Sequence, residues 1–189
     1  ITVGGLGFFV WQDLLDGRFR FSKLRLHSKL VIFVSVILSL LGALFLFLLE
    51  LSGGGFSGLS APEQILASLF QSVTLRTAGF NSIDLTKLSE GSIFFMICLM
   101  LVGGSTGSTA GGIKTTTVAV LFLSIFTTFR RKKNVEVFGR RLEDDITRTA
   151  SCIFMLYLTL LIVSTLMISA VEGLPVLPVL FETASAVAT

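Results

Sequence analysis

A run of small and hydroxylated residues interrupts an apolar segment that extends from Ile93 to Phe126. The run reads GGSTGSTAGGIKTTT from Gly103 to Thr117, and it contains Lys114. A continuous helix over 92–129 would be about 57 Å long, nearly twice the ~30 Å of hydrocarbon in a bilayer. Lipid tolerates irregular backbone and an ammonium group only where they are buried in protein or line a water-filled path. The run therefore predicts a broken helix beside a pore or transport pathway.

The composition places the chain among integral membrane proteins. Hydrophobic residues make up 52% and charged residues 14% of the sequence, whereas an average soluble domain carries about a quarter charged residues. Three segments are long enough to cross a bilayer: 30–49, 93–129 through the glycine-rich run, and 150–171. The apolar segment 1–15 lacks the charged leader of a signal peptide. We expect it to be the end of a span that begins upstream, and the chain to be a fragment.

Most of the lysine and arginine residues lie in two short segments, 16–29 and 130–149. Under the positive-inside rule both segments are cytoplasmic loops, so two crossings must separate them. The spans that start at Leu30 and Ile93 supply those crossings, and the segment between Glu50 and Glu90 then faces outward. Topology thus accounts for the net charge of +3, and we expect no nucleic-acid partner.

The two cysteines and the histidine show no metal-ligand spacing. Cys98 and Cys152 lie within apolar spans, where a thiol behaves as a small hydrophobe, and His27 stands alone in a basic segment. We expect no disulfide, no metal centre of these residues, no bound cofactor and no catalytic residue.

The outward-facing segment contains a pattern that is typical of a pore loop, over residues 60–83. Ser60-Ala61-Pro62-Glu63 predicts a helix start, with proline in the first turn and a capping glutamate. The helical stretch 64–75 is too short to cross a bilayer. Thr77-Ala78-Gly79-Phe80-Asn81 follows it, and its glycine permits backbone angles that a helix excludes. The alternative is an extracellular helix and turn, but the apolar side chains of the stretch favour a submerged half-helix and an extended return.

The order of elements occurs twice. Arg25 and Glu50 bracket one span, and Arg148 and Glu172 bracket another at nearly equal separation. Each span is followed by proline and then by Leu-Phe-Gln at 69–71 or Leu-Phe-Glu at 180–182. This parallel predicts repeats of the same orientation.

A half-helix aimed at the membrane centre presents its negative C-terminal end there, and backbone carbonyls can replace the hydration shell of a cation. The physical argument alone does not separate potassium from sodium.

The strings RTAGFN at 76–81 and GGSTGSTAGGIKTTT at 103–117 strongly resemble the Trk/Ktr potassium-uptake family. Gly4-Gly5-Leu6-Gly7-Phe8 and Phe181-Glu182-Thr183-Ala184-Ser185-Ala186 are similar to flanking elements of that family. The resemblance is closest to the KtrB-type membrane subunit, with the TrkH type as the related alternative. It implies an all-α, multi-pass protein of the bacterial plasma membrane with four potassium-channel-like M1-P-M2 repeats, each giving one glycine to a filter.

By this resemblance, 1–15 corresponds to the end of the second repeat, 30–129 to the third and 150–189 to the start of the fourth. The implied filter residues are Thr77, Ala78, Gly79, Phe80 and Asn81, with potassium held by the backbone of the first three. The implied intramembrane gate comprises Gly103, Gly104, Ser105, Gly107, Ser108, Thr109, Gly111, Gly112, Lys114 and Thr115. Because the other filter glycines lie outside the chain, we expect no activity of these 189 residues alone.

The resemblance also implies partners. We expect a lipid bilayer around the spans, a homodimer of the full-length subunit, and a cytoplasmic nucleotide-binding regulatory subunit of the RCK type on the basic loop 130–149. Potassium is the implied transported ion, with sodium as a possible activator. The basic loop has a second interpretation, in which it only sets orientation and contacts anionic lipid.

Arg76 lies beside the predicted filter, where an unpaired cation would repel permeating ions. We expect its side chain to point away from the pore toward a carboxylate, with Glu182 on the neighbouring pore helix as the partner. The alternative is an arginine that extends to the outer interface.

Other interpretations of the run and of the fold remain open. Gly103, Gly107 and Gly111 recur every four residues, as in helix-packing contacts. Segment 107–115 nearly spells a phosphate-binding loop, but Ile113 separates the glycine from the lysine. The alternative functions are a secondary cation transporter with broken helices and a non-conducting structural membrane subunit. Because such transporters commonly use inverted repeats, the shared orientation of the repeats favours a pore.

Overall fold

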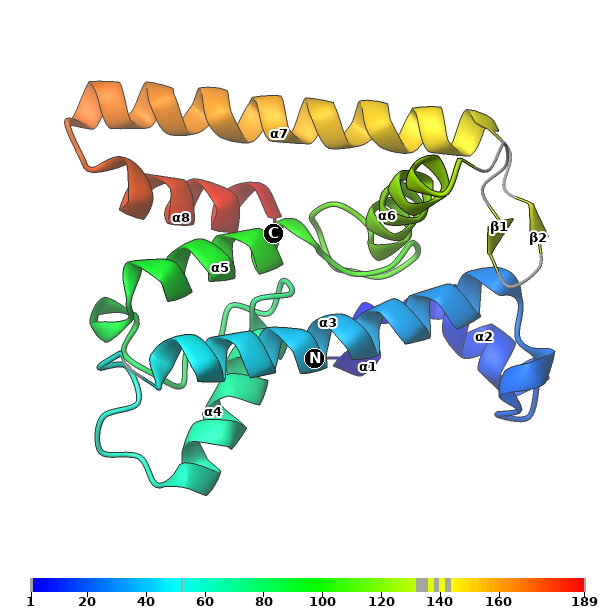
Figure 1. The fold of residues 1–189 in the computed structure, drawn as a ribbon, viewed down its shortest axis with the longest axis horizontal. Helices are drawn as coiled ribbons and strands as arrows, with labels where there is room; N and C mark the ends of the chain where they lie inside the picture. The colour runs from blue at the N-terminus through cyan, green and yellow to red at the C-terminus, as the bar shows by residue number, and fades with distance from the viewer. Residues whose placement is uncertain (1, 52, 132–135, 138–139, 142–143, 189) are drawn as a thin grey trace.

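The computed structural model describes residues 2–51, 53–131, 136–137, 140–141 and 144–188 (Figure 1). The elements in chain order are α1 (Thr2–Gly5), α2 (Phe8–Asp16), η1 (Phe21–Lys23), α3 (Leu26–Glu50), α4 (Ala61–Thr74), η2 (Leu85–Lys87), α5 (Glu90–Leu101), α6 (Thr115–Phe129), β1 (Glu136–Val137), β2 (Arg140–Arg141), α7 (Asp144–Glu172) and α8 (Val176–Ala188). The predicted all-helical architecture is confirmed, apart from the two-residue antiparallel ladder of β1 and β2 in the basic loop.

Two of the described helices, α3 and α7, are long and apolar enough to cross a membrane. They contain the predicted spans 30–49 and 150–171, and each extends a few residues beyond them. The 25 residues of α3 correspond to about 37 Å of helix, slightly more than the hydrocarbon thickness. Both helices run in the same direction, and each is followed by a shorter helix, α4 or α8 (Figure 1). The predicted repeat orientation therefore matches the arrangement of these elements.

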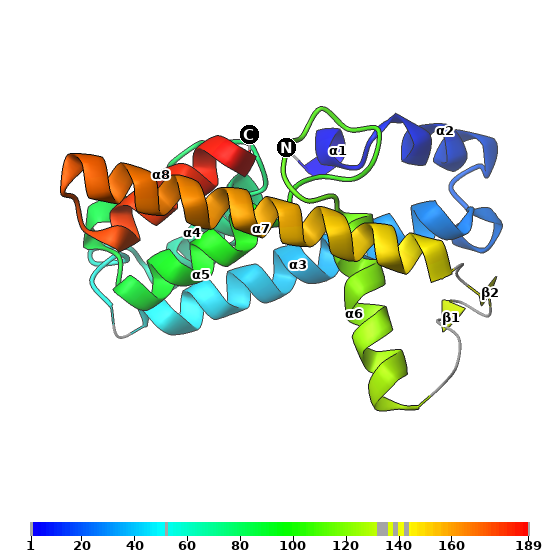
Figure 2. The same cartoon turned by 90° about the horizontal axis from the view of Figure 1, so that it is seen from above.

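The predicted span 93–129, the second span of the complete repeat, is broken as the sequence predicts. Helix α5 ends at Leu101 and α6 begins at Thr115, so the last three residues of the predicted gate run belong to the first turn of α6. Between the two helices, Val102 and Ile113 pair as an isolated bridge. Helix α6 projects away from the other helices (Figure 2), because the irregular segment changes the direction of the chain.

Helix α4 begins with the predicted cap. The carboxylate of Glu63 accepts hydrogen bonds from the Ser60 backbone N–H at 2.8 Å and the Ser60 hydroxyl at 2.7 Å. The helix then packs against α3, where the Ser72 hydroxyl donates to the Ser39 carbonyl at 2.9 Å. This contact holds the C-terminal end of α4 against α3. It thereby positions the filter-like sequence that follows α4.

The main core surrounds α5, which lies between α3 and α8 (Figure 1). Met96 of α5 is fully buried, and Leu46 of α3 and Ala184 of α8 pack in the same cluster. Many apolar side chains on the far sides of α3 and α7 remain exposed, for example Leu156 at 72%. Apolar side chains thus occupy the outer faces of these helices as well as the core, as expected for helices that face lipid or further membrane-embedded helices.

Candidate ion pathway

The chain reverses direction immediately after α4. The Thr74 carbonyl accepts hydrogen bonds from the backbone N–H groups of Ala78 at 3.0 Å and Gly79 at 3.2 Å. The buried Thr74 hydroxyl accepts a third from the Phe80 N–H at 2.9 Å. One threonine at the end of α4 thus holds the whole turn.

Two residues of this turn adopt left-handed backbone angles. Thr77 has a φ of 71° and Gly79 a φ of 70°. Glycine takes this conformation without penalty, whereas a β-branched residue such as threonine adopts it at a cost. A strained residue of this kind persists only where its surroundings hold it, and the three hydrogen bonds to Thr74 do so here.

A cavity of about 280 Å³ lies between this turn and α8. The cavity is lined by Thr74, Leu75, Thr77, Ala78, Gly79, Asn81, Leu85, Met100, Phe181, Glu182, Ser185 and Ala188. Four of the five predicted filter residues therefore meet around one space, together with Glu182. The fifth, Phe80, does not line it, and its side chain is exposed.

The electrostatics of the cavity favour a cation. Helix α4 ends at Thr74, which lines the cavity, and α8 lines it with Phe181, Glu182, Ser185 and Ala188. A helix C-terminus carries a partial charge of about −0.5, so the end of α4 places negative charge at this space. The carboxyl group of Glu182 adds to the negative character of the wall.

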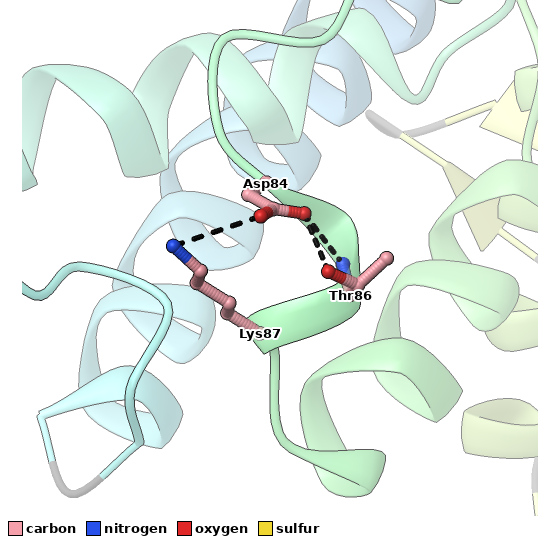
Figure 3. A network of polar contacts seen from close by, with 3 residues as sticks. All are labelled: Asp84, Thr86 and Lys87. Atoms are coloured by element: carbon pink, nitrogen blue, oxygen red, sulfur yellow. Dashed lines mark hydrogen bonds and ion pairs between the residues drawn. The ribbon is translucent and has the colours of Figure 1, made fainter.

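The return segment from the turn to α5 consists of bends and the short helix η2 rather than an extended strand. The Asp84 carboxylate accepts hydrogen bonds from the Thr86 hydroxyl at 2.7 Å and the Thr86 N–H at 3.1 Å (Figure 3). Its second oxygen lies 3.7 Å from the Lys87 ammonium. The Thr86 hydroxyl bond in particular holds the pKa of Asp84 below its usual value. The contacts of Asp84 give the segment a defined local fold.

The predicted pairing of Arg76 with Glu182 is wrong. The Arg76 guanidinium donates to the Ser35 carbonyl at 3.4 Å, the Ser35 hydroxyl at 3.3 Å and the Gly103 carbonyl at 3.3 Å. Within the described residues, the ion pairs join Arg25 to Asp13 and Lys87 to Asp84, and neither involves Arg76 or Glu182. Arg76 leaves the end of α4 on the side of α3, whereas Glu182 lines the cavity. The arginine thereby connects the filter-like turn to the first residue of the glycine-rich run.

The glycine-rich run forms a compact loop. The N–H of Gly103 donates to the Ile113 carbonyl at 3.0 Å, and the Thr115 N–H donates to the Gly104 carbonyl at 3.1 Å. A side chain on Gly103 would lie 1.9 Å from the Gly111 carbonyl oxygen, so the two strands of the loop approach too closely for any other residue. Within the loop, the half-buried Lys114 ammonium donates to the Ala110 carbonyl at 2.6 Å.

The loop is attached to the beginning of the chain. Ser105 donates its backbone N–H to the Gly5 carbonyl at 3.0 Å and its hydroxyl to the Leu6 carbonyl, and the Phe8 N–H donates to the Gly107 carbonyl at 3.1 Å. The bond to the Leu6 carbonyl accounts for the hydroxyl of Ser105. Ser108 turns back on the loop, where its hydroxyl donates to the Ser105 carbonyl, while Thr109 is exposed.

The predicted gate residues do not line the cavity, but they adjoin it. Gly112 lies against the end of α8, where a side chain would be 3.5 Å from the Ala188 carbonyl oxygen. Arg76 provides the second link through Gly103. The loop is thus joined to the turn by one hydrogen bond, and it lies against α8 on another wall of the cavity.

Sequence reasoning missed the residues that position the turn. Thr74 and Ser35 hold the filter-like turn and Arg76, and Leu85 and Met100 complete the cavity wall. The signal for Thr74 was a hydroxyl in the last turn of the predicted helical stretch 64–75. No signal in the sequence indicates Ser35, because its role depends on the packing of α3 against α4.

The fold and the cavity define a helical membrane protein built from channel-like repeats. The sequence profile of the TrkH family, described as "Cation transport protein", matches residues 12–189. The chain belongs to this family and is part of an integral protein of the plasma membrane.

Curated relatives and a solved structure support the assignment. Potassium/sodium uptake protein NtpJ of Enterococcus hirae is 38% identical over 176 residues, which are 93% of this chain and 39% of the relative. Ktr system potassium uptake protein B of Bacillus subtilis is 37% identical over 187 residues, 98% of this chain and 42% of the relative. The chain therefore spans about two fifths of the length of these relatives.

The crystal structure of the potassium transporter TrkH from Vibrio parahaemolyticus has the same fold. It matches with a TM-score of 0.75 at 21% sequence identity, over 89% of this chain and 37% of that chain. The predicted channel-like repeats and broken helix are confirmed at the level of the fold.

Proposed function

We propose that this chain contributes one pore-forming repeat and part of the next to a potassium-uptake protein of the plasma membrane. The cavity carries the proposal, because Thr77, Ala78 and Gly79 line it beside the C-terminus of α4. In this proposal the carbonyl groups of those three residues replace part of the hydration shell of potassium. The names of the relatives, a potassium/sodium uptake protein and a Ktr potassium uptake protein, support this ion class.

We propose in addition that the loop between α5 and α6 is the gate. The loop is irregular, it interrupts a membrane helix, and it adjoins the cavity at Ala188. Its hydrogen bonds to Gly5, Leu6 and Phe8 support one closed arrangement. Opening then requires these bonds to break, which links the loop to the helix that precedes α3.

The proposed partners bind on the predicted cytoplasmic side. Arg130, Arg131 and Arg148 are exposed at the ends of the basic segment 130–149, and we assign this segment to docking of an RCK-type regulatory subunit. The name "Ktr system" of the B. subtilis relative is consistent with more than one component. A homodimer of the full-length subunit and activation by sodium belong to the same proposal.

The proposed function predicts uptake by the full-length protein that contains this chain. Expressed in a bacterial strain without its own potassium-uptake systems, it should restore growth at limiting potassium and carry radioactive rubidium. Excess potassium should suppress rubidium entry more strongly than an equal concentration of sodium, because the proposed carbonyl site fits the larger ion. A protein that reaches the membrane and carries neither ion would favour the structural-subunit alternative.

The contacts of Arg76 predict a second result. Replacement by glutamine removes the guanidinium that donates to Ser35 and Gly103. The buried Gly103 carbonyl then has no partner, at a free-energy cost of about 1–3 kcal/mol. We expect R76Q to lower rubidium uptake per molecule at least about fivefold, and R76K to retain an intermediate rate. The exposed Arg20 supplies the matched control, R20Q, which should transport normally. Recovery of activity in the charge-swapped pair R76E/E182R would contradict the observed contacts.

A further inference from the structure

Glu50 is a buried carboxylate at the predicted outer end of α3. Its exposed fraction is 2%, yet the ion pairs within the described part of the chain do not include it. Instead, one oxygen accepts hydrogen bonds from the Ser89 N–H and the Ser89 hydroxyl, both at 3.0 Å. The other oxygen accepts one from the Gly55 N–H at 3.1 Å. A buried carboxylate is tolerated only with such a set of donors.

The loop after α3 is shaped around this carboxylate. A side chain on Gly55 would lie 2.8 Å from a Glu50 carboxylate oxygen and 2.5 Å from the Leu88 side chain. The neighbouring Gly54 has no such constraint, because the nearest atom would be 3.7 Å away. The bond between Glu50 and Gly55 therefore depends on the absence of a side chain at position 55.

Glu50 fixes the far end of the return segment. At its start the segment is held by the bond between the Phe80 N–H and Thr74. At its end it reaches Ser89, which Glu50 binds across 39 residues of sequence. Leu85, between the two attachments, lines the cavity. The segment thus has two anchors, one on α4 and one on α3.

The same contact places α5. Ser89 is the N-cap of α5, since its hydroxyl accepts the Ser92 N–H at 3.2 Å. The other end of α5 carries Met100, which lines the cavity, and leads into the glycine-rich loop. A shift of Ser89 would therefore move two parts of the cavity wall together.

We propose that Glu50 is a positioning residue of the ion pathway, which holds the return segment and α5 in the geometry that discriminates between cations. This inference rests on the proposed transport of potassium. It assigns to Glu50 a role in selectivity, exerted through Ser89 and Gly55, without contact to the ion.

The test compares matched variants of the full-length protein, with rubidium uptake measured in competition with potassium and with sodium and normalised to the amount of protein in the membrane. E50Q keeps the shape of the side chain but turns an amide donor toward Ser89 or Gly55. We expect about a tenfold loss of discrimination between potassium and sodium, the effect of a buried donor that loses its acceptor. G55A should produce the same change without altering the carboxylate. The controls are G54A and E90Q, and Glu90 is an exposed carboxylate one residue beyond Ser89. Both controls should discriminate between potassium and sodium as the native protein does.

The outcomes separate this inference from the proposed function. Native discrimination in both E50Q and G55A overturns it, even if less protein accumulates, because a purely structural role changes protein amount and not ion preference. Should E50Q fail to accumulate, G55A decides alone. A native protein that carries neither rubidium nor potassium refutes the proposed function instead, and that result is visible before any variant is compared.

Discussion

Alanine at position 79 is expected to remove most potassium selectivity from the full-length protein. Gly79 has a φ of 70°, which costs an alanine about 1 kcal/mol, although no atom lies within 4 Å of the added carbon. We expect the backbone to relieve this strain by rotating, which would change the direction of the carbonyl groups beside the cavity. Rubidium uptake in the presence of competing potassium or sodium should show at least about a fivefold loss of discrimination.

Gly58 provides a matched control for this substitution. It has a φ of 88°, and a side chain there would likewise meet no atom within 4 Å. Gly58 belongs to the loop between α3 and α4, and it is not among the residues that line the cavity. G58A should therefore carry a similar backbone strain with native uptake. Equal losses in both variants, or native selectivity in G79A, would contradict a role of the 77–79 backbone in binding the ion.

The sequence was sufficient for the features that depend on local physics. The lengths of α3 and α7 follow from uninterrupted apolar segments, and the start of α4 follows from the Ser60–Glu63 cap. The break after α5 follows from a composition that cannot continue a membrane helix. In each case the decisive interactions lie within a few residues of one another, so the pattern in the sequence contains them.

The partners of the half-buried Arg76 and the buried Glu50 were not predictable in the same way. Charge alone suggested a carboxylate partner for Arg76. Instead, Arg76 donates to the carbonyl and the hydroxyl of Ser35 on α3, 41 residues away in the sequence. Glu50 was noted only as the end of a span, whereas its donors lie on a glycine loop and on Ser89. Both outcomes depend on how α3 packs against its neighbours. A buried ion can be satisfied by neutral groups as well as by an opposite charge, and the sequence does not indicate which.

Replacing Lys114 with glutamine is expected to raise the flux of potassium through the protein when the gate is closed. The Lys114 ammonium donates to the Ala110 carbonyl at 2.6 Å and closes the loop on itself. A hydrogen bond from a charged group contributes about 1.5–3 kcal/mol. Because glutamine is shorter and neutral, it removes both this bond and the positive charge in the loop. Rubidium flux into vesicles that contain the full-length protein alone should rise at least about fivefold.

Two further variants separate the charge from the hydrogen bond. K114R retains a cationic donor and should keep flux near the native level, whereas K87Q removes an exposed lysine that pairs with Asp84 and should have no effect on the closed state. If K114R leaks as much as K114Q, the exact fit of the ammonium group to Ala110 restrains the loop, and the charge is secondary. Unchanged flux in K114Q would instead place the barrier to ions elsewhere, since the loop would then lose its strongest internal polar contact without opening the pathway.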